Sequence, residues 1–239
     1  MERLKAFFES IPQAKILDVG TGRGNFIDLI DYLYKDYDKI VGIDIMDRMV
    51  ELAAKHFEGN ERIKIVKRDI LQTGFPKEHF DIVCLSNSLH HLEEMKATFV
   101  AMEELVKPGG YLLFNEMMKD NLNDRQVSHR LIHHFSAKLD TETGMIHNET
   151  YDRQEIVDHV KANTTFEVVD FWDMEVPVSE PTPEETEQMA QTVDVLLMRL
   201  KNDELIAKHK EEAEEIKSYI RKYGVEACTQ LIVIAKRKN

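Results

Sequence analysis

The chain has few cysteines, no excess of basic residues and no long apolar run. Its 239 residues include two cysteines, Cys84 and Cys228, each inside a short strand-like run. They indicate reduced core residues and exclude a disulfide framework or a cysteine-based metal site. No apolar run approaches the ~20 residues that cross a bilayer, and the charged start MERLKAFFES is unlike a signal sequence. We therefore expect a soluble, cytoplasmic protein without a membrane partner.

The charge balance is acidic, with 31 Lys and Arg against 44 Asp and Glu and a net charge of −13. This balance disfavours nucleic acid as a partner, because no basic excess offsets the repulsion of the phosphates. The length suits one buried α/β core with roughly 40 to 80 residues to spare for elaborations. We predict a single domain over 1–239.

The first half of the chain alternates short β-branched runs with amphipathic helical stretches. The predicted strands are AKILDVG (14–20), KIVGID (39–44), RIKIVKRD (62–69), FDIVCLSNS (80–88) and GGYLLFNEM (109–117). Helices are expected near 24–34, 46–57 and 95–106, the last followed by a KPGG stop. This rhythm is typical of a doubly wound α/β sheet, whose ligand lies beyond the carboxyl ends of the strands.

The second half departs from this rhythm. A polar, histidine-bearing helix is expected at 120–140 and a loop at 141–150, so that 119–150 forms a cap or pocket segment. A helix at 153–161 and strands at 165–176 and 227–238 follow the same α/β logic. Between those strands, a Pro-punctuated linker (177–185) leads into a helical insertion over 183–223, either one broken helix or a hairpin ending near Gly224. Its apolar stripe requires a partner, which makes the insertion a lid or a dimerisation arm.

A glycine-rich turn joins the first predicted strand to the first predicted helix. Gly20, Gly22 and Gly24 are spaced G-x-G-x-G. A dinucleotide fingerprint needs a small residue at position 25, where this chain has Asn25, and no Lys-Ser or Lys-Thr follows as in a phosphate loop. The spacing therefore disfavours NAD and ATP, and it leaves the methionyl end of S-adenosylmethionine as a third ligand.

Acidic residues follow the next two predicted strands, Asp44 after KIVGID and Asp69 within VKRDI. Together with Asp18, the glycine turn, DIVCLSNSLHHL and LVKPGGYLLF, they form an order that resembles the class I S-adenosylmethionine-dependent methyltransferases. The resemblance is close from about Leu4 to Glu116. The His-His-Leu after the fourth strand is similar to the ubiquinone and menaquinone biosynthesis branch. The resemblance implies a seven-stranded Rossmann-like methyltransferase sheet with S-adenosyl-L-methionine as cofactor.

The same resemblance implies a set of cofactor-binding residues. They are Asp18, Gly20, Thr21, Gly22, Gly24, Asp44, Ile45, Met46, Asp69, Ile70, Ser86 and Asn87. The glycine turn would approach the methionyl part, Asp44 the ribose hydroxyls and Asp69 the adenine amino group. Ser86 and Asn87 would face the sulfonium and the acceptor. Each residue also has an ordinary structural interpretation, such as a helix cap or a core contact.

Methyl transfer from a sulfonium needs in-line positioning, and for some acceptors a base. Histidine is the natural candidate because its pKa lies near neutrality. We select His90, His91 and His133 as candidate catalytic residues; the alternative is that they pack or cap helices.

A second histidine cluster follows the fifth predicted strand. Its members are His129, His133, His134 and His147. His129 and His133 stand one turn apart and could ligate a metal with His147, but no H-E-x-x-H motif or cysteine supports this, so we expect no metal. The cluster is otherwise a wall of the acceptor pocket or a solvated helix. The wall would include Glu116, Tyr151 and Arg153, and Trp172 either lines the same cleft or packs.

The predicted function is transfer of a methyl group to oxygen, nitrogen or carbon of a small organic acceptor. The N-P-P-[YF] element of amino-methylating nucleic-acid enzymes is absent. Two alternatives stay open: a non-catalytic module that binds S-adenosylmethionine, and a methyltransferase that acts on protein or RNA. A homodimer through the helical insertion is a further expectation.

Overall fold

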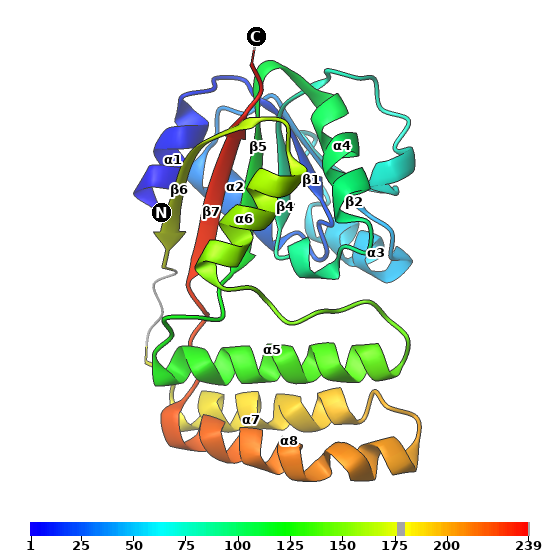
Figure 1. The fold of residues 1–239 in the computed structure, drawn as a ribbon, viewed down its shortest axis with the longest axis vertical. Coiled ribbons are helices and arrows are strands. Elements are labelled where there is room, and N and C mark those ends of the chain that lie inside the picture. Colours follow the sequence, from blue (N-terminus) through cyan, green and yellow to red (C-terminus); the bar gives the residue numbers. More distant parts are fainter. Residues whose placement is uncertain (176–179, 239) are drawn as a thin grey trace. The chain divides into compact units, whose positions relative to one another are not determined.

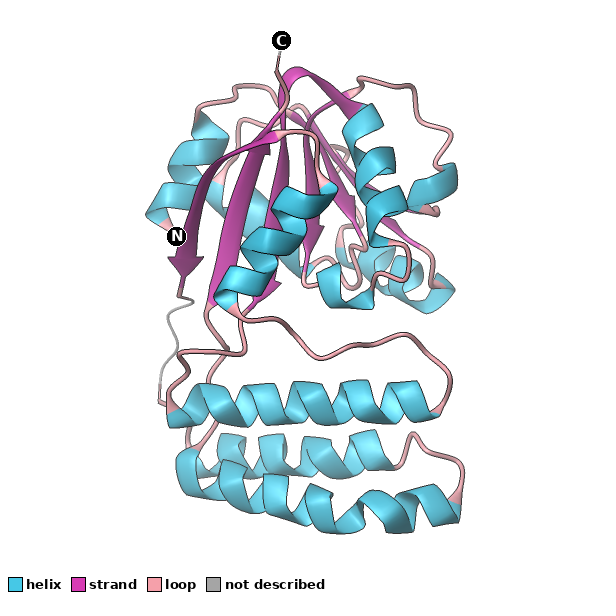
Figure 2. Cartoon of the chain, in the orientation of Figure 1, coloured by secondary structure: helices cyan, strands magenta, loops and turns pink. Residues whose placement is uncertain are grey.

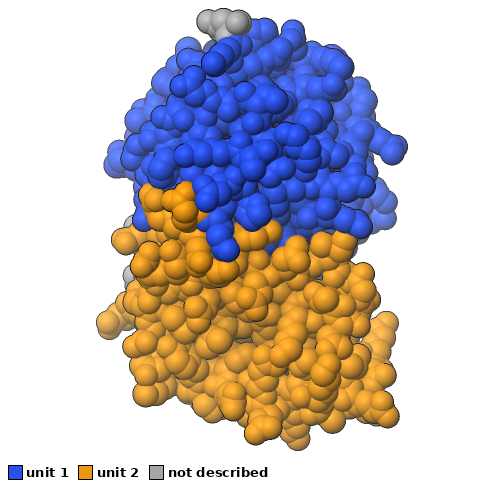
Figure 3. All heavy atoms as spheres, in the orientation of Figure 1, with its two compact units in different colours: residues 1–116, 155–174, 231–239 blue, residues 117–154, 175–230 orange. Residues whose placement is uncertain are grey.

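The computed structural model describes residues 1–175 and 180–238. Val176, the end of the predicted sixth strand, and 177–179 of the predicted linker lie outside the described residues. The chain divides into two compact units, coloured in Figure 3. The sheet unit comprises Met1–Glu116, Glu155–Met174 and Leu231–Asn239, and the helical unit comprises Met117–Gln154 and Glu175–Gln230.

A seven-stranded sheet forms the centre of the sheet unit (Figure 2). Its strands are β1 (Lys15–Val19), β2 (Lys39–Asp44), β3 (Ile63–Lys67), β4 (Phe80–Ser86), β5 (Val106–Met117), β6 (Glu167–Met174) and β7 (Gln230–Lys236). They are ordered β3-β2-β1-β4-β5-β7-β6, with parallel pairing from β3 to β5 and with β7 antiparallel. The predicted α/β class and all seven strands are confirmed.

Helices cover both faces of this sheet. They are α1 (Glu2–Glu9), α2 (Asn25–Leu33), α3 (Asp47–His56), α4 (Met95–Leu105) and α6 (Arg153–Asn163), with short 3-10 turns η1 (Ile70–Gln72) and η2 (Leu89–His91). In Figure 1, α4 and α6 lie in front of the sheet and α2 lies behind it. Phe8 of α1 and Ile27 and Ile30 of α2 are fully buried in one core with Ile16 and Ile82 of the sheet. Burial of these apolar faces is what holds the helices on the strands.

Strand β5 begins earlier than predicted, at Val106 rather than 109, so that the KPGG stretch belongs to the strand. A register irregularity between Phe80 and Ile82 of β4 accommodates the additional residues. A side chain at Gly110 would come within 2.7 Å of the Asp81 carbonyl oxygen, so only glycine fits this close approach. Helix α4 does end before KPGG, as predicted, but β5 begins at the next residue without an intervening turn.

The described residues of the helical unit form the helices α5 (Asp124–Glu142), α7 (Pro183–Leu197) and α8 (Asp203–Tyr223). Thr182 and Glu185 form a capping box at the start of α7, and Gly224, with φ of 77°, ends α8. Helices α7 and α8 form a hairpin, the second of the two expected arrangements (Figure 1). Their apolar stripe packs against α5 in one buried core. No helix among the described residues is long and apolar enough to cross a membrane.

Candidate functional site

The glycines of the turn between β1 and α2 have positive φ angles, which residues with a side chain rarely adopt. Gly20, Gly22 and Gly24 have φ values of 66°, 54° and 93°. A Cβ at Gly20 would lie 2.8 Å from the Ser88 hydroxyl, and one at Gly24 would lie 2.4 Å from the Phe57 ring. At Gly22 nothing lies within 4 Å of the same position. Neighbouring side chains thus crowd Gly20 and Gly24, whereas Gly22 leaves open space where a ligand can approach the backbone.

Asp18 holds this turn through a hydrogen bond with Thr21. It is buried at the end of β1, and its Oδ2 accepts a hydrogen bond of 2.7 Å from the Thr21 hydroxyl. Burial raises the pKa of Asp18 to about 7, the bond from Thr21 acts in the opposite direction, and the nearby charge of Asp44 raises it further. The backbone N–H of Thr21 donates to the Ile43 carbonyl, which fixes the turn against β2.

Asp44, the last residue of β2, accepts hydrogen bonds from two backbone N–H groups. Its Oδ2 accepts from the Gly22 N–H at 2.9 Å, and its Oδ1 accepts from the Met46 N–H at 2.8 Å. The next two side chains are unusually exposed for apolar residues, with Ile45 66% and Met46 52% accessible. An exposed apolar surface beside a fixed carboxylate suits a ligand with one flat apolar part and one hydroxylated part.

Asp69 and Ile70 follow β3, at the same edge of the sheet as Asp44 because parallel strands share their carboxyl ends. Asp69 is exposed and caps η1 by accepting from the Leu71 N–H at 2.9 Å. Leu71 adds a third exposed apolar side chain, and Ile70 is half-buried. The structure thus places both acidic residues at adjacent strand ends.

Ser86 and Asn87 lie where β4 ends. The Asn115 amide of β5 donates to the Ser86 hydroxyl at 2.8 Å, and the Asn87 N–H donates to the Asn115 carbonyl at 2.7 Å. Asn87 has a φ of 44°, a left-handed conformation that asparagine tolerates better than most residues. The turn after β4 is therefore held by β5, and Ser88 reaches back toward the carbonyls of Ser86 and Gly20.

A buried acid and imidazole pair follows this turn. His90 Nδ1 lies 2.7 Å from Glu116 Oε1, and the two side chains are 0% and 1% exposed. The other carboxylate oxygen of Glu116 accepts from the Leu89 N–H at 2.9 Å. His91 is exposed, with its ring centroid 4.3 Å from that of His90. Sequence reasoning placed Glu116 only in a pocket wall, because a carboxylate at a strand end does not reveal its partner.

Residues 17–114 match the family described as methyltransferase domain. This stretch contains the glycine turn, Asp44, Asp69 and the histidines after β4, in the strand order described above. Residues 17–114 are therefore similar to methyltransferase domains, in the part of the chain that contains the glycine turn.

Three curated relatives match part of this chain. The ubiquinone/menaquinone biosynthesis C-methyltransferase of Shewanella oneidensis is 25% identical over 147 residues, which cover 60% of this chain and 57% of the relative. Phosphoethanolamine N-methyltransferase of Plasmodium falciparum is 31% identical over 116 residues, covering 46% and 43%. A highly reducing polyketide synthase of Alternaria alternata is 30% identical over 120 residues, 46% of this chain and 5% of the synthase. The chain thus spans 57% or less of each of these relatives.

Solved structures resemble this chain in fold. A methyltransferase of Bacillus halodurans C-125 superposes with a TM-score of 0.59 at 16% identity, covering 98% of this chain and 99% of that one. At this identity the likeness concerns the fold alone.

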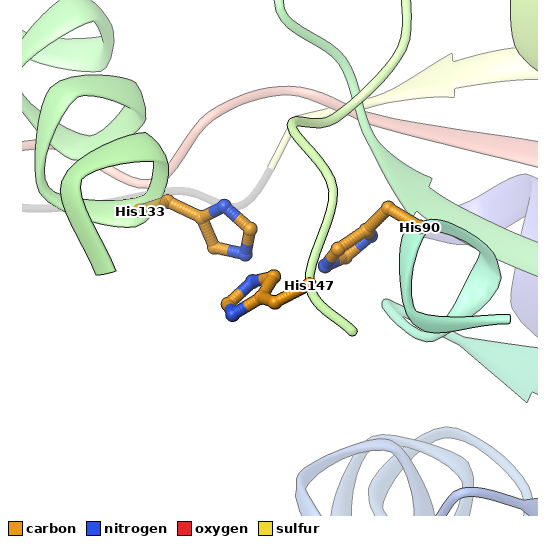
Figure 4. Close-up of side chains that lie close together, drawn as sticks. All are labelled: His90, His133 and His147. Atoms are coloured by element: carbon orange, nitrogen blue, oxygen red, sulfur yellow. The ribbon is translucent and has the colours of Figure 1, made fainter. Parts of the chain in front are cut away.

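The remaining histidine candidates lie in the helical unit. His133 is half-buried on α5, and its ring centroid is 5.0 Å from that of His147 (Figure 4). His129 Nδ1 accepts from the Cys228 N–H at 3.1 Å, and burial lowers the pKa of His129. His129 therefore has a structural contact with the chain entering β7. The one-turn spacing from His129 to His133 does not make a shared ligand pair.

Trp172 packs in the core of the sheet unit rather than lining a cleft. The Arg3 guanidinium lies over its ring, 4.5 Å from the centroid. In the helical unit, Tyr151 forms a bridge with Met118, and the Arg153 N–H donates to Asp120 at 2.9 Å. The sequence left two interpretations of Trp172, lining the cleft or packing in the core, and the structure shows packing.

Proposed function

We propose that this protein transfers a methyl group from S-adenosylmethionine to a small organic acceptor, at oxygen, nitrogen or carbon. The link from Asp44 to the Gly22 N–H carries the donor side of the proposal, because it joins the glycine turn to the second strand end. The curated relatives support a small acceptor, since two of them are named for a quinone pathway and for phosphoethanolamine. They differ in the atom methylated, so the atom stays open.

The residues present fit this cofactor. The open space at Gly22 admits a methionyl chain against the backbone, and the exposed Ile45 and Met46 offer an apolar surface for adenine. Each oxygen of Asp44 already accepts one N–H, but a carboxylate has about four lone-pair positions, which leaves capacity for the ribose hydroxyls. Asp69 has the same spare capacity for the adenine amino group. When bound, the cofactor supplies an electrophilic methyl group on a sulfonium.

His90 is our candidate for the base. Glu116 binds its Nδ1, which fixes the ring orientation, and Nε2 is the nitrogen that would take a proton from an acceptor. Ser86 ends β4 and Asn87 follows it, and both would hold the acceptor in line with the sulfur. His91, exposed beside His90, is the second candidate. A role for His133 in the reaction stays a prediction.

Calorimetry and labelled turnover test the function. Tight binding of S-adenosylhomocysteine without binding of NAD is expected, followed by transfer of labelled methyl into a metabolite extract rather than into macromolecules. Binding without turnover of any acceptor pool would support the non-catalytic module instead. Label in protein or RNA would support a macromolecular acceptor, which the net charge of −13 disfavours.

We further propose that chain 1–239 acts as one methyltransferase domain, with 119–150 and 183–223 selecting the acceptor. The apolar stripe of α7 and α8 is covered by α5 of the same chain, which favours a lid over a dimerisation arm. Val195 of α7 and Met198 directly after it are large apolar side chains that stay exposed. Light scattering on wild type and on V195E/M198E tests this: a monomer in both supports the lid, and a dimer that the double variant dissociates supports the arm.

A further inference from the structure

We propose that His133 and His147 bind a divalent transition-metal ion within the helical unit. One ring nitrogen of each lies within 4.8 Å of the other, from α5 and from the loop that follows it (Figure 4). The two rings are nearly perpendicular, at 83°. This separation is within reach of a shared ion after small rotations of the side chains. The inference does not rest on the proposed methyl transfer.

His147 has the hydrogen bond that typically orients a metal-binding histidine. Its Nδ1 lies 2.8 Å from Asp140 Oδ2, and the two side chains are 9% and 12% exposed. A carboxylate on one ring nitrogen fixes the tautomer and makes the other nitrogen a better ligand. Arg199 binds the second oxygen of Asp140 and thereby holds that carboxylate in place. Asp140 and His133 of α5 and His147 of the following loop therefore supply the carboxylate and the two imidazoles of such a site.

The loop itself is also fixed. The Thr141 hydroxyl lies 2.9 Å from the Ala137 carbonyl oxygen and 3.2 Å from the His147 carbonyl oxygen, which places the backbone of His147 beside the last turn of α5. A groove in the helical unit is lined by His147 together with acidic and basic side chains, among them Glu142, Glu149, Arg130 and Lys138. The groove gives an ion a route from solvent to His147.

The donor chemistry limits the ion. Two imidazoles suit Zn²⁺, Co²⁺, Ni²⁺ or Cu²⁺, whereas Mg²⁺ and Ca²⁺ require oxygen ligands. Water and further donors would complete the coordination, so an open, exchangeable site is expected. The sequence analysis expected no metal, because the chain has no established metal-binding motif. His133 and His147 lie on a helix and in a loop that folding brings together, and such an arrangement leaves no motif in the sequence.

The experiment is titration of the full-length, EDTA-treated protein with Co²⁺ by visible absorption and with Zn²⁺ by calorimetry. The variants are H133Q, H147Q and D140N, and the matched control is H56Q, an exposed histidine that also pairs with an aspartate. We expect one ion per chain in wild type and in H56Q. Both glutamine variants should abolish that binding, and D140N should weaken it by about 10- to 100-fold.

Three results would overturn the proposal: no binding to wild type, equal binding by all variants, or binding lost in H56Q. The last two indicate surface histidines only. Circular dichroism and the unfolding midpoint of each variant show whether it folds; if H147Q does not, D140N and H133Q carry the test. Binding of S-adenosylhomocysteine is measured separately, so failure of the metal site leaves the proposed function untouched.

Discussion

The Glu116 carboxylate binds the His90 ring at 2.7 Å and the Leu89 N–H at 2.9 Å, all in a region closed to solvent. One side chain at the end of β5 therefore fixes both the backbone and the imidazole of the turn after β4. A buried carboxylate needs its hydrogen bonds, because leaving one unmade costs the full desolvation of the group. The orientation of His90 thus depends on Glu116.

Replacement of His90 by glutamine should lower kcat by about 10²- to 10⁴-fold, which is the usual contribution of a general base. E116Q should lower kcat by a smaller factor, because glutamine keeps one acceptor oxygen but removes the charge next to the ring. Neither change should alter the affinity for S-adenosylhomocysteine. The checks are initial rates on an identified acceptor and calorimetric affinities. A loss of cofactor binding equal to the loss of rate would show that the pair is only structural.

Replacement of Asp44 by asparagine should weaken binding of S-adenosylhomocysteine. The carboxylate accepts from Gly22 and Met46, and an amide has one acceptor oxygen in place of two. A hydrogen bond to a charged group contributes about 1.5 to 3 kcal/mol, so we expect a Kd higher by roughly 10- to 150-fold. D47N is the matched control, because Asp47 is an exposed residue nearby, paired with Lys67. If D44N and D47N bind S-adenosylhomocysteine equally well, Asp44 does not contact the cofactor.

Alanine substitutions at Gly24 and Gly22 should affect stability and cofactor binding differently. G24A introduces a Cβ 2.4 Å from the Phe57 ring at a φ of 93°, so it should destabilise the fold by about 2 to 5 kcal/mol, the sum of left-handed strain and overpacking. G22A meets no neighbour and should cost only the strain of about 1 to 2 kcal/mol. Urea unfolding measures both. G22A should nevertheless lose cofactor affinity, since its methyl group fills the open space; unchanged affinity there would contradict the proposed position of the ligand.

Local patterns predicted most of the fold. Strand and helix positions follow from apolar periodicity, and the ends of α7 and α8 follow from Thr182 and Gly224, because these signals involve residues close in sequence. The strand-end positions of Asp44 and Asp69 were predictable for the same reason.

Pairings across the fold were not predictable. His90 and Glu116 are 26 residues apart and meet only because β4 and β5 are neighbours. The Asp140 contact of His147 depends on how the loop after α5 folds back. His129 looked equivalent to His133 in the sequence, yet it contacts the Cys228 N–H, 99 residues away. Such contacts depend on topology and side-chain rotamers, which a single sequence does not specify.

The burial of Asp18 should make stability depend on pH in an unusual direction. Its pKa in the folded protein is raised to about 7, whereas in the unfolded chain it is near the ordinary value of 3.8. Between these values the folded state holds more protons than the unfolded state, so this group lowers the free energy of unfolding as pH rises. The full penalty applies above pH 7 and disappears below the unfolded pKa.

D18N tests this because asparagine does not titrate. The difference in free energy of unfolding, D18N minus wild type, should rise by up to about 4 kcal/mol from pH 4 to pH 8, with most of the rise below pH 7. Urea unfolding at several pH values measures it, and other titrating groups cancel because both proteins share them. The buried amide adds a constant offset, since it still accepts from the Thr21 hydroxyl. A difference that does not change with pH would show that Asp18 is ionised in the folded protein throughout this range.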